Sequence, residues 1–332
     1  MFWKNKNKYW DEPDLSPLSA LEKPLLIMMC GLPGSGKSCK AKTLSEKLDC
    51  IVFSSDQIRK ELFGDENSQE NNNKVFRILH ERVIGALKAG QNVIFDATNL
   101  NSRKRSAFLR QIKKIDCYKF CYLIPTPYED CIKNNKKRER QVPELVIKNM
   151  YKSFQVPYYN EGFDDIIVDW SVLKRDKWNG DKAIYKLRRI KHDNPHHKYT
   201  IGEHCMKAQS YAILNTTDMM VWRAALLHDV GKRFCKEFDD NKVAHYYGHE
   251  SVSAYMSLAY MKQYASSRAH CTQEDILKVA FLINYHMRIM QLENLTNEEQ
   301  KRRALSRMRR KLGDDLMNDL MLLREADEHG QR

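Results

Sequence analysis

The pattern of hydrophobic and polar positions changes near residue 172. Before this point, short apolar runs alternate with segments in which apolar residues recur at helical spacing, as in the helix expected over 37–48. Short apolar runs separated by helices are typical of buried strands. We expect strands over 25–31, 50–56, 91–98, 117–124 and 163–170. This alternation predicts an α/β fold, with a doubly wound parallel sheet covered by helices on both faces.

The second half of the chain predicts helices only. They are expected over 201–213, 218–228, 247–264, 273–288, 296–312 and 313–328. The segment 173–195 is polar, contains Gly180 and Pro195, and has the composition of a connector. We therefore expect four parts: an N-terminal extension over 1–22, the α/β domain over 23–172, a linker over 173–195 and an all-α domain over 196–332.

Composition narrows the class of protein. The 332 residues are 42% hydrophobic and 30% charged, as in globular proteins, and the net charge of +13 favours a polyanionic partner such as nucleic acid. The nine cysteines include no Cys-x-x-Cys, so we expect a reducing, cytoplasmic compartment. The first 20 residues lack the apolar core of a signal peptide, and no apolar run approaches the roughly 20 residues that cross a bilayer. We expect no membrane partner.

A phosphate-binding loop follows the first predicted strand. "GLPGSGKS" over 31–38 has the G-x-x-x-x-G-K-S pattern in the required position between a strand and a helix. The residues expected to form the cradle are Gly31, Gly34, Ser35 and Gly36. Lys37 would reach the terminal phosphates of ATP, and the Ser38 hydroxyl would bind Mg²⁺. The motif predicts an NTPase or a kinase.

Polar residues at the ends of later strands are candidates for substrate contacts. Asp56 and Arg59 follow the second strand, where a carboxylate would accept the proton of an attacking hydroxyl and an arginine would hold a phosphate. The alternative for this pair is a helix-capping Asp with a surface Arg. The third strand ends in a further set of candidates: Asp96, Thr98, Asn99 and Arg103. Lys136, Lys137, Arg138 and Arg140 form a basic segment that would close as a lid or serve only as a solvated face.

Residues 25–170 resemble the kinase domain of the phage-type polynucleotide 5′-kinases. The resemblance rests on the phosphate loop, on "SSDQIR", on "DATNLN" and on the lid segment that ends in "IKNMYKSF". It implies that Asp56 is the general base on the 5′-hydroxyl and that Arg59 contacts the 3′ side of the acceptor. Arg138 and Arg140 would stabilise the transferring phosphoryl group. Small-molecule kinases share this scaffold, so phosphoryl transfer is indicated more firmly than a nucleic-acid acceptor.

Histidines and aspartates recur on separate helices of the second half. "ALLHDVGK" over 225–232 ends an apolar helix with adjacent His228 and Asp229, and taken alone this is as compatible with a hydrogen-bonded core pair as with metal ligands. The other members of the set are His204, His249, His286 and Asp327. Imidazoles and carboxylates from several helices are how metal sites are built in helical domains.

The order of these residues resembles the HD superfamily of metal-dependent phosphohydrolases. The resemblance implies that a first metal is held by His204, His228, Asp229 and Asp327. His249 and His286 would bind a second ion bridged by Asp229, and Lys232 would bind the substrate phosphate. One metal, or a metal-free structural domain, are the alternatives. Mixed nitrogen and oxygen ligands suit Mn, Fe, Ni or Zn.

The two resemblances together predict a bifunctional enzyme that heals nucleic-acid ends. It would phosphorylate 5′-hydroxyl ends with ATP and remove 3′-phosphates or 2′,3′-cyclic phosphates, with RNA preferred over DNA as partner. Fusions of these two modules exist as a family in which the HD module comes first, the reverse of the order here. One alternative is a nucleoside or nucleotide kinase fused to an HD nucleotidohydrolase. Another is an ATP-dependent RNA-binding switch with a non-catalytic HD domain.

Overall fold

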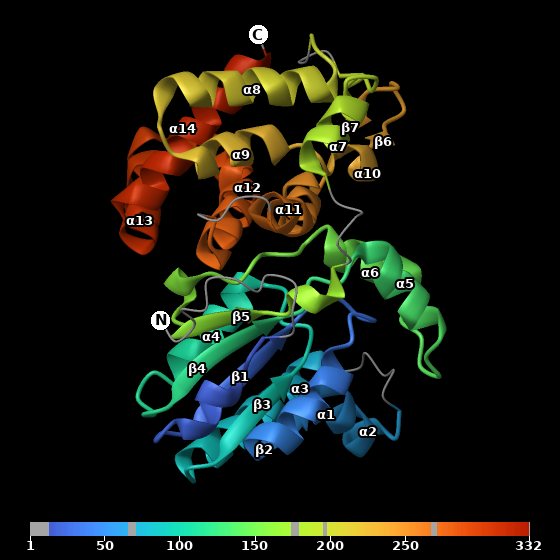
Figure 1. Ribbon diagram of the computed structural model, residues 1–332, viewed down its shortest axis with the longest axis vertical. Helices are drawn as coiled ribbons and strands as arrows, with labels where there is room; N and C mark the ends of the chain where they lie inside the picture. Colours follow the sequence, from blue (N-terminus) through green and yellow to red (C-terminus); the bar gives the residue numbers. More distant parts are fainter. Residues whose placement is uncertain (1–12, 66–70, 174–178, 195–197, 267–270, 332) are drawn as a thin grey trace. The chain divides into compact units, whose positions relative to one another are not determined.

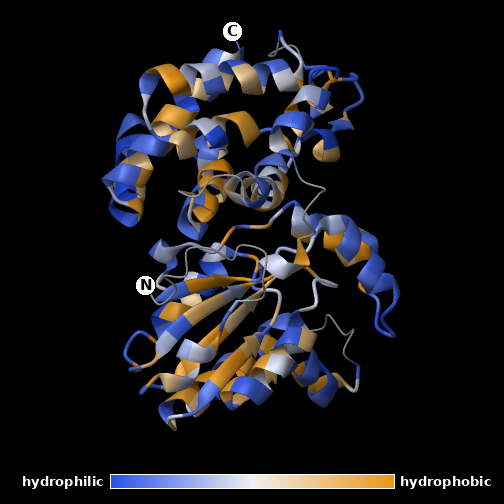
Figure 2. Cartoon of the chain, viewed as in Figure 1, coloured by the Kyte–Doolittle hydropathy of each residue, from blue (hydrophilic) through white to orange (hydrophobic). Residues whose placement is uncertain are grey.

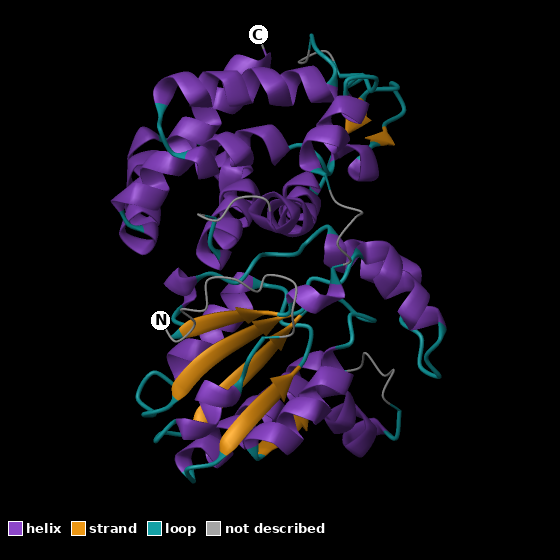
Figure 3. Cartoon of the chain, viewed as in Figure 1, coloured by secondary structure: helices purple, strands orange, loops and turns teal. Residues whose placement is uncertain are grey.

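The computed structural model of the protein describes residues 13–65, 71–173, 179–194, 198–266 and 271–331 (Figure 1). The chain divides into two compact units. The first comprises Met1–Met150 and Pro157–Lys174, and the second comprises Tyr151–Val156 and Arg175–Arg332. Strands dominate the centre of the first unit, whereas the second is built almost entirely of helices (Figure 3).

The first unit contains a five-stranded parallel sheet in the order β2-β3-β1-β4-β5. The strands are β1 (Leu25–Cys30), β2 (Cys50–Ser54), β3 (Asn92–Asp96), β4 (Tyr118–Leu123) and β5 (Asp165–Val168). Every residue of β1 is buried, which is why the strand reads as a continuous apolar run rather than an alternating one. The orange strands in Figure 2 show this concentration of apolar residues in the sheet. The predicted α/β fold is confirmed for this unit.

Helices and short 3-10 turns connect the strands. They are η1 (Ser16–Ala20), α1 (Lys37–Leu48), α2 (Ser55–Phe63), α3 (Asn72–Lys88), α4 (Ser102–Gln111), α5 (Tyr128–Lys136), α6 (Glu144–Tyr151), η2 (Tyr159–Glu161) and η3 (Trp170–Val172). Since β1 pairs with β3 on one side and β4 on the other, the strand order changes direction at β1. Ligands of such sheets bind at the carboxyl ends of the strands beside this point, and the phosphate loop follows β1 there.

Part of the predicted N-terminal extension belongs to the sheet domain. Leu18 is buried in the cluster formed by one face of the sheet and α1, and Leu15 and Leu21 pack against the same cluster. The extension therefore contributes apolar surface to the core from Leu15 onward. Residues 1–12 of the predicted extension lie outside the described residues.

The second unit is a helical bundle with one small hairpin. Its elements are α7 (Gly180–Leu187), α8 (Ile201–Asn215), α9 (Met219–Leu227), α10 (Lys232–Cys235), β6 (Glu237–Phe238), β7 (Ala244–His245), α11 (His249–Ser266), α12 (Gln273–Glu293), α13 (Glu298–Leu312) and α14 (Asp314–Gln331). The hairpin was not expected. Helix α7 lies inside the segment that we predicted as a linker. Its apolar face, which includes the buried Ile184 and Leu187, is short and lies among charged residues, so the sequence pattern did not reveal it.

The segment Tyr151–Val156 differs most from the expected domain boundaries. We predicted it within the α/β domain, but it packs in the helical unit. The side-chain amide of Asn284 on α12 donates to the carbonyl of Phe154 at 3.0 Å, and its oxygen accepts from the backbone N–H of Val156 at 2.8 Å. One asparagine thus pairs two backbone groups of this segment.

Among the helices in the described ranges, none is both long enough and apolar enough to cross a membrane.

Candidate active sites

The phosphate loop has the backbone conformation that its glycines require. Gly34 and Gly36 adopt positive φ angles of 78° and 95°. A Cβ atom on Gly34 would lie 2.2 Å from the carbonyl oxygen of Cys131, so this position excludes any side chain. The Lys37 ammonium donates to the Leu32 carbonyl at 2.7 Å and is thereby held over the loop. Burial lowers the pKa of Lys37.

Asp56 lies between two arginines. It occupies the first turn of α2, where the Ser54 hydroxyl caps the helix by accepting from the Asp56 backbone N–H. Its Oδ1 is 2.9 Å from an Arg59 guanidinium nitrogen, and its Oδ2 is 2.5 Å from one of Arg140. The Asp56 side chain is 37% exposed, so solvent and substrate can reach it. The structure brings together three residues that the sequence predicted for catalysis.

A groove of about 640 Å³ opens beside Asp56. Its lining consists of Ser38, Lys42, Ser45, Val52, Ser54, Asp56, Gln57, Lys60, Asp96 and Arg138. Burial raises the pKa of Asp96, against the opposing effects of the Lys37 charge and a hydrogen bond with Ser38. The groove therefore joins the phosphate loop, the ends of β2 and β3, and one of the two predicted lid arginines.

The lid arginines lie on a loop rather than on a helix. Helix α5 ends at Lys136, and the loop that follows carries Arg138 and Arg140. The Asn135 side chain closes this loop, since its amide donates to the Val142 carbonyl at 2.8 Å and its oxygen accepts from the Val142 N–H at 3.0 Å. The basic run alone gave no sign of this closure.

The other strand-end candidates have different surroundings. The side-chain amide of Asn99 donates to the Met29 carbonyl at 2.8 Å, and the backbone carbonyl of Asn99 accepts from the Arg105 guanidinium at 2.8 Å. Asn99 has a φ of 46°, so it serves the turn that follows β3. The carbonyl of Thr98 accepts from the backbone N–H of Gly31, and Arg103 is exposed on α4. These contacts favour structural roles for Thr98 and Asn99, while Arg103 remains accessible.

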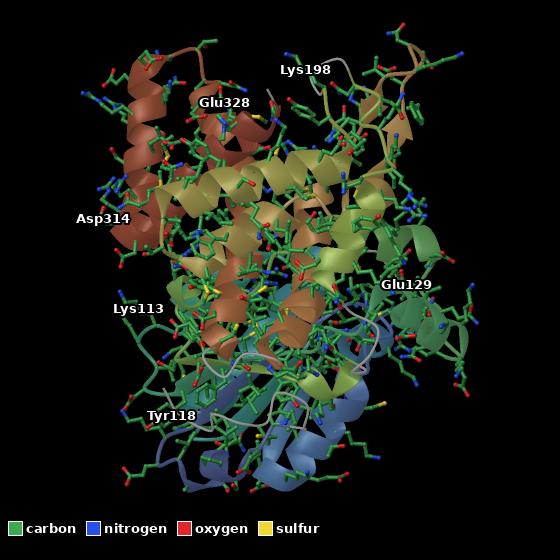
Figure 4. All side chains as sticks on the ribbon, turned by 45° about the horizontal axis from the view of Figure 1, so that its top comes forward. Lys113, Tyr118, Glu129, Lys198, Asp314 and Glu328 are labelled. Carbon is green, nitrogen blue, oxygen red and sulfur yellow. The ribbon has the colours of Figure 1, made fainter. Side chains whose placement is uncertain are left out.

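The helical unit brings all six predicted metal ligands together in its interior. They form two groups in which the candidate ligand atoms lie within 4.8 Å of one another. The first triad is His204, His228 and Asp327, and the second triad is Asp229, His249 and His286. All six residues are buried. Figure 4 labels Glu328, which directly follows Asp327 near the end of α14.

Asp229 belongs to the second triad but also lies close to the first. Its Oδ2 is 3.2 Å from Nε2 of His204 in the first triad, and its Oδ1 is 3.3 Å from Nε2 of His249 in the second. Lys232 places its ammonium 2.6 Å from Oδ2. The two oxygens of one carboxylate therefore face different triads, as a ligand shared by two ions would.

Helix α9 ends at Leu227, so His228 and Asp229 lie just beyond it and not in its last turn as expected.

The imidazoles are oriented as metal ligands usually are. His228, His249 and His286 each place Nδ1 at 2.7, 2.8 and 2.7 Å from a backbone carbonyl three residues earlier. Because a carbonyl can only accept, Nδ1 carries the proton and Nε2 presents its lone pair. Nε2 of His228 lies only 2.9 Å from Nε2 of His204. Lone pairs converging with carboxylates in a dry interior fit a divalent transition metal.

The ionisation of this cluster reflects its burial and its mixed charges. Burial lowers the pKa of His204, but hydrogen bonds and charges from Asp229 and Asp327 outweigh it and raise the pKa to about 9. Burial and two neighbouring imidazoles lower the pKa of His286 to about 3. Burial opposes ionisation of Asp229, yet Lys232 and the imidazoles hold its pKa well below the usual range. The two carboxylates are therefore charged and His286 is neutral, the forms that bind cations, whereas His204 would have to release its proton to bind a metal.

Residues 26–157 match the family model described as an AAA domain. The first unit is a P-loop kinase-type domain. The chain is 32% identical over 158 residues to the L-seryl-tRNA(Sec) kinase of Methanococcus maripaludis, covering 44% of this chain and 59% of that protein. It is 26% identical to the putative bifunctional polynucleotide kinase/RNA ligase of Autographa californica nuclear polyhedrosis virus, covering 39% of this chain and 20% of that one. The chain thus spans less than two thirds of either relative.

Solved structures resemble parts of the chain more weakly. A chain of the Pnkp1/Rnl/Hen1 RNA repair complex is 24% identical, with a TM-score of 0.38 and coverage of 48% of this chain and 54% of that one. A gluconokinase from Sinorhizobium meliloti is 15% identical, with a TM-score of 0.33 and coverage of 45% and 83%. No conclusion about this chain follows from either likeness.

Some residues that shape the two sites gave no recognisable signal in the sequence. In the kinase-type domain, Glu161 of η2 forms a buried double contact with Arg105, at 2.7 and 2.6 Å. In the helical unit, a Cβ atom on Gly330 would lie 2.9 Å from Nδ1 of His204, so α14 can approach α8 only with glycine there. Both are packing relations between distant segments, and spacing within one segment cannot reveal them.

Proposed function

We propose that the protein is a bifunctional enzyme that prepares broken nucleic-acid ends, preferably RNA ends, for rejoining. Its domains would be a polynucleotide kinase over 23–172 and an HD-type phosphohydrolase over 196–332, working in the cytoplasm. The observation that carries the proposal is the presence, in one chain, of an accessible Asp56 beside a phosphate loop and of two buried His/Asp triads that Asp229, a member of the second, connects. Phosphoryl transfer and phosphate removal are complementary reactions at the two sides of a break.

In the kinase half, P-loop kinases use ATP and Mg²⁺, and the chain's own residues suit both. Lys37 would bind the terminal phosphates, and Ser38 would hold Mg²⁺. Asp56 would orient the 5′-hydroxyl and accept its proton. Arg59 and Arg140, now paired with Asp56, are close enough to contact the acceptor and the transferring phosphoryl group. Such contacts stabilise charge that develops in the transition state.

In the helical half, the two triads would hold one or two divalent transition metals, with Asp229 shared between them. Metal ions bound there would supply an activated water and stabilise the phosphoryl oxygens. The carbonyl contacts of the three Nδ1 atoms keep the imidazoles in place and direct Nε2 inward. Lys232, 2.6 Å from Asp229, would hold a substrate phosphate next to the ligands.

The names of the relatives support an RNA-linked acceptor. One relative is named as a kinase of L-seryl-tRNA(Sec), and another as a polynucleotide kinase joined to an RNA ligase. The first relative also favours a second candidate function, in which the kinase acceptor is the seryl hydroxyl carried by a tRNA. The remaining alternatives for the chain are a small-molecule kinase joined to a nucleotidohydrolase and an ATP-dependent RNA-binding switch with a non-catalytic helical half.

The test is a single RNA that carries a 5′-hydroxyl and a 2′,3′-cyclic phosphate, incubated with ATP, Mg²⁺ and Mn²⁺ and analysed at both ends. We expect a 5′-phosphate to appear and the cyclic phosphate to disappear. Lys37→Ala should abolish only the first change, and Asp229→Ala only the second. Arg110→Ala, an exposed position on α4 outside every predicted site, serves as the control and should retain both.

Different outcomes separate the alternatives. Phosphorylation of seryl-tRNA but not of the RNA would replace the polynucleotide kinase by the second candidate. Labelling of nucleosides alone would favour the small-molecule kinase. If Asp229→Ala removed both activities, the assignment of separate centres to the two units would be wrong.

A further inference from the structure

We propose that Lys42 and Lys60 form a phosphate-binding subsite for the second nucleotide of a polynucleotide acceptor. This inference rests on the proposed kinase function and specifies its substrate: a chain of at least two or three nucleotides rather than a nucleoside. The subsite lies in the groove beside Asp56, away from the phosphate loop.

The groove extends beyond the reacting groups along two helices. Ser38, Lys42 and Ser45 line it from α1, and Asp56, Gln57 and Lys60 line it from α2. Spacings of three and four residues place Ser38, Lys42 and Ser45 on one face of α1, and the same spacings relate Lys60 to Gln57 and Asp56 on α2. The groove is therefore lined in part by two helices, each of which begins at the carboxyl edge of the sheet.

On each helix, a lysine lies about one turn beyond a polar residue near the phosphoryl-transfer end of the groove. Lys42 follows Ser38 by four residues, and Lys60 follows Asp56 by four residues, so each lysine lies about 6 Å farther along its helix axis. That displacement is comparable to the spacing of successive phosphates along a nucleic-acid strand. An acceptor whose 5′-hydroxyl meets Asp56 and whose first phosphate meets Arg59 would direct its second phosphate toward the two lysines.

The charges of the lining separate the groove into two parts. Its carboxylates, Asp56 and Asp96, are both at the end where phosphoryl transfer would occur. The part farther along the helices is lined by Lys42, Lys60 and the Ser45 hydroxyl, and both lysines are exposed. Two lysines and a hydroxyl attract a phosphate more strongly than they attract an uncharged sugar or nucleoside.

The experiment measures KM and kcat for phosphorylation of a 3′-mononucleotide and of oligonucleotides of two, three, five and ten residues. For the unmodified protein we expect KM to fall as the acceptor gains its second and third phosphates. Lys42→Ala and Lys60→Ala should each raise KM for the longer acceptors and leave the mononucleotide unchanged. Near 0.1 M salt, one lost phosphate contact corresponds to roughly a fivefold increase in KM, with a reduction of about 0.7 in the salt slope.

The matched control is Lys47→Ala. Lys47 is also exposed on α1 but does not line this groove. If Lys47→Ala raised KM as much as Lys42→Ala, the effect would come from net charge and the subsite would be wrong. Equal losses for the mononucleotide and the oligonucleotides would also overturn it. If the unmodified protein phosphorylated nucleosides but no oligonucleotide, the proposed kinase function itself would fail.

Discussion

Replacing Asp229 by asparagine tests the metal centre without relying on catalysis. The change preserves the shape of the side chain and removes the one carboxylate whose two oxygens face both triads. Asparagine keeps one oxygen and places an amide nitrogen at the other position. Since an amide nitrogen does not bind a metal, the variant should lose the shared ligand and bind less metal per chain.

The size of the effect follows from linkage between metal binding and folding. An ion at 100 times its Kd stabilises the folded state by about 2.7 kcal/mol. In a domain of about 150–250 residues, each kcal/mol raises Tm by about 2–4 °C. Mn²⁺ at that excess should therefore raise the Tm of the helical unit by about 5–10 °C. Asp229→Asn should abolish most of this shift, because even losing a residue that only orients a ligand lowers metal affinity about 10–100-fold.

Differential scanning calorimetry, with and without Mn²⁺, is the appropriate assay, accompanied by a count of bound metal per chain. ATP with Mg²⁺ serves as the internal control, because it should shift the transition of the kinase-type domain equally in both proteins. A variant that still binds two ions per chain, with the full increase in Tm, would refute the assignment of Asp229. The absence of any metal-dependent shift in the unmodified protein would refute the metal centre itself.

Three further substitutions test contacts that hold the sites in place. Glu161→Gln leaves the buried Arg105 guanidinium without its counter-charge and should destabilise the kinase-type domain by about 3–5 kcal/mol in urea unfolding; a loss below 1 kcal/mol would contradict this. Gly330→Ala introduces a Cβ 2.9 Å from Nδ1 of His204 and should lower Mn²⁺ affinity in a calorimetric titration while leaving kinase activity intact. Gly34→Ala adds a Cβ 2.2 Å from a carbonyl of α5 at a positive φ, so ATP binding followed by fluorescence should be lost.

The strands and helices could be predicted well because local signals were strong. The predicted and observed α1 coincide at 37–48, where the phosphate loop sets the start and the chain turns at Asp49. Predicted strands were too long by one to two residues at their ends, as at 50–56, because the Ser54 cap begins α2 earlier than the apolar run suggests. Helix α7 was missed because its short apolar face lies within a charged segment.

The candidate sites could be predicted only as lists of residues. The sequence placed Asp56, Arg59 and Arg140 at plausible positions, but the contact of Arg140 with Asp56 depends on the loop that Asn135 closes. For the helical unit the sequence named all six ligand candidates. Their division into two triads depends on how α8, α9, α11, α12 and α14 cross, which no pattern within a single helix determines.

A comparison of Asp56 with Asp229 shows how surroundings separate two aspartates that look alike in the sequence. Asp56 is the second residue after β2 and Asp229 the second after α9, and both lie near basic residues. The Asp56 side chain is 37% exposed in an open groove, whereas that of Asp229 is 1% exposed among imidazoles and Lys232. A general base must meet a substrate hydroxyl directly, so only Asp56 has the access that this role needs. A buried carboxylate needs permanent cationic partners, so Asp229 is suited to binding metal and not to receiving a proton from a polynucleotide.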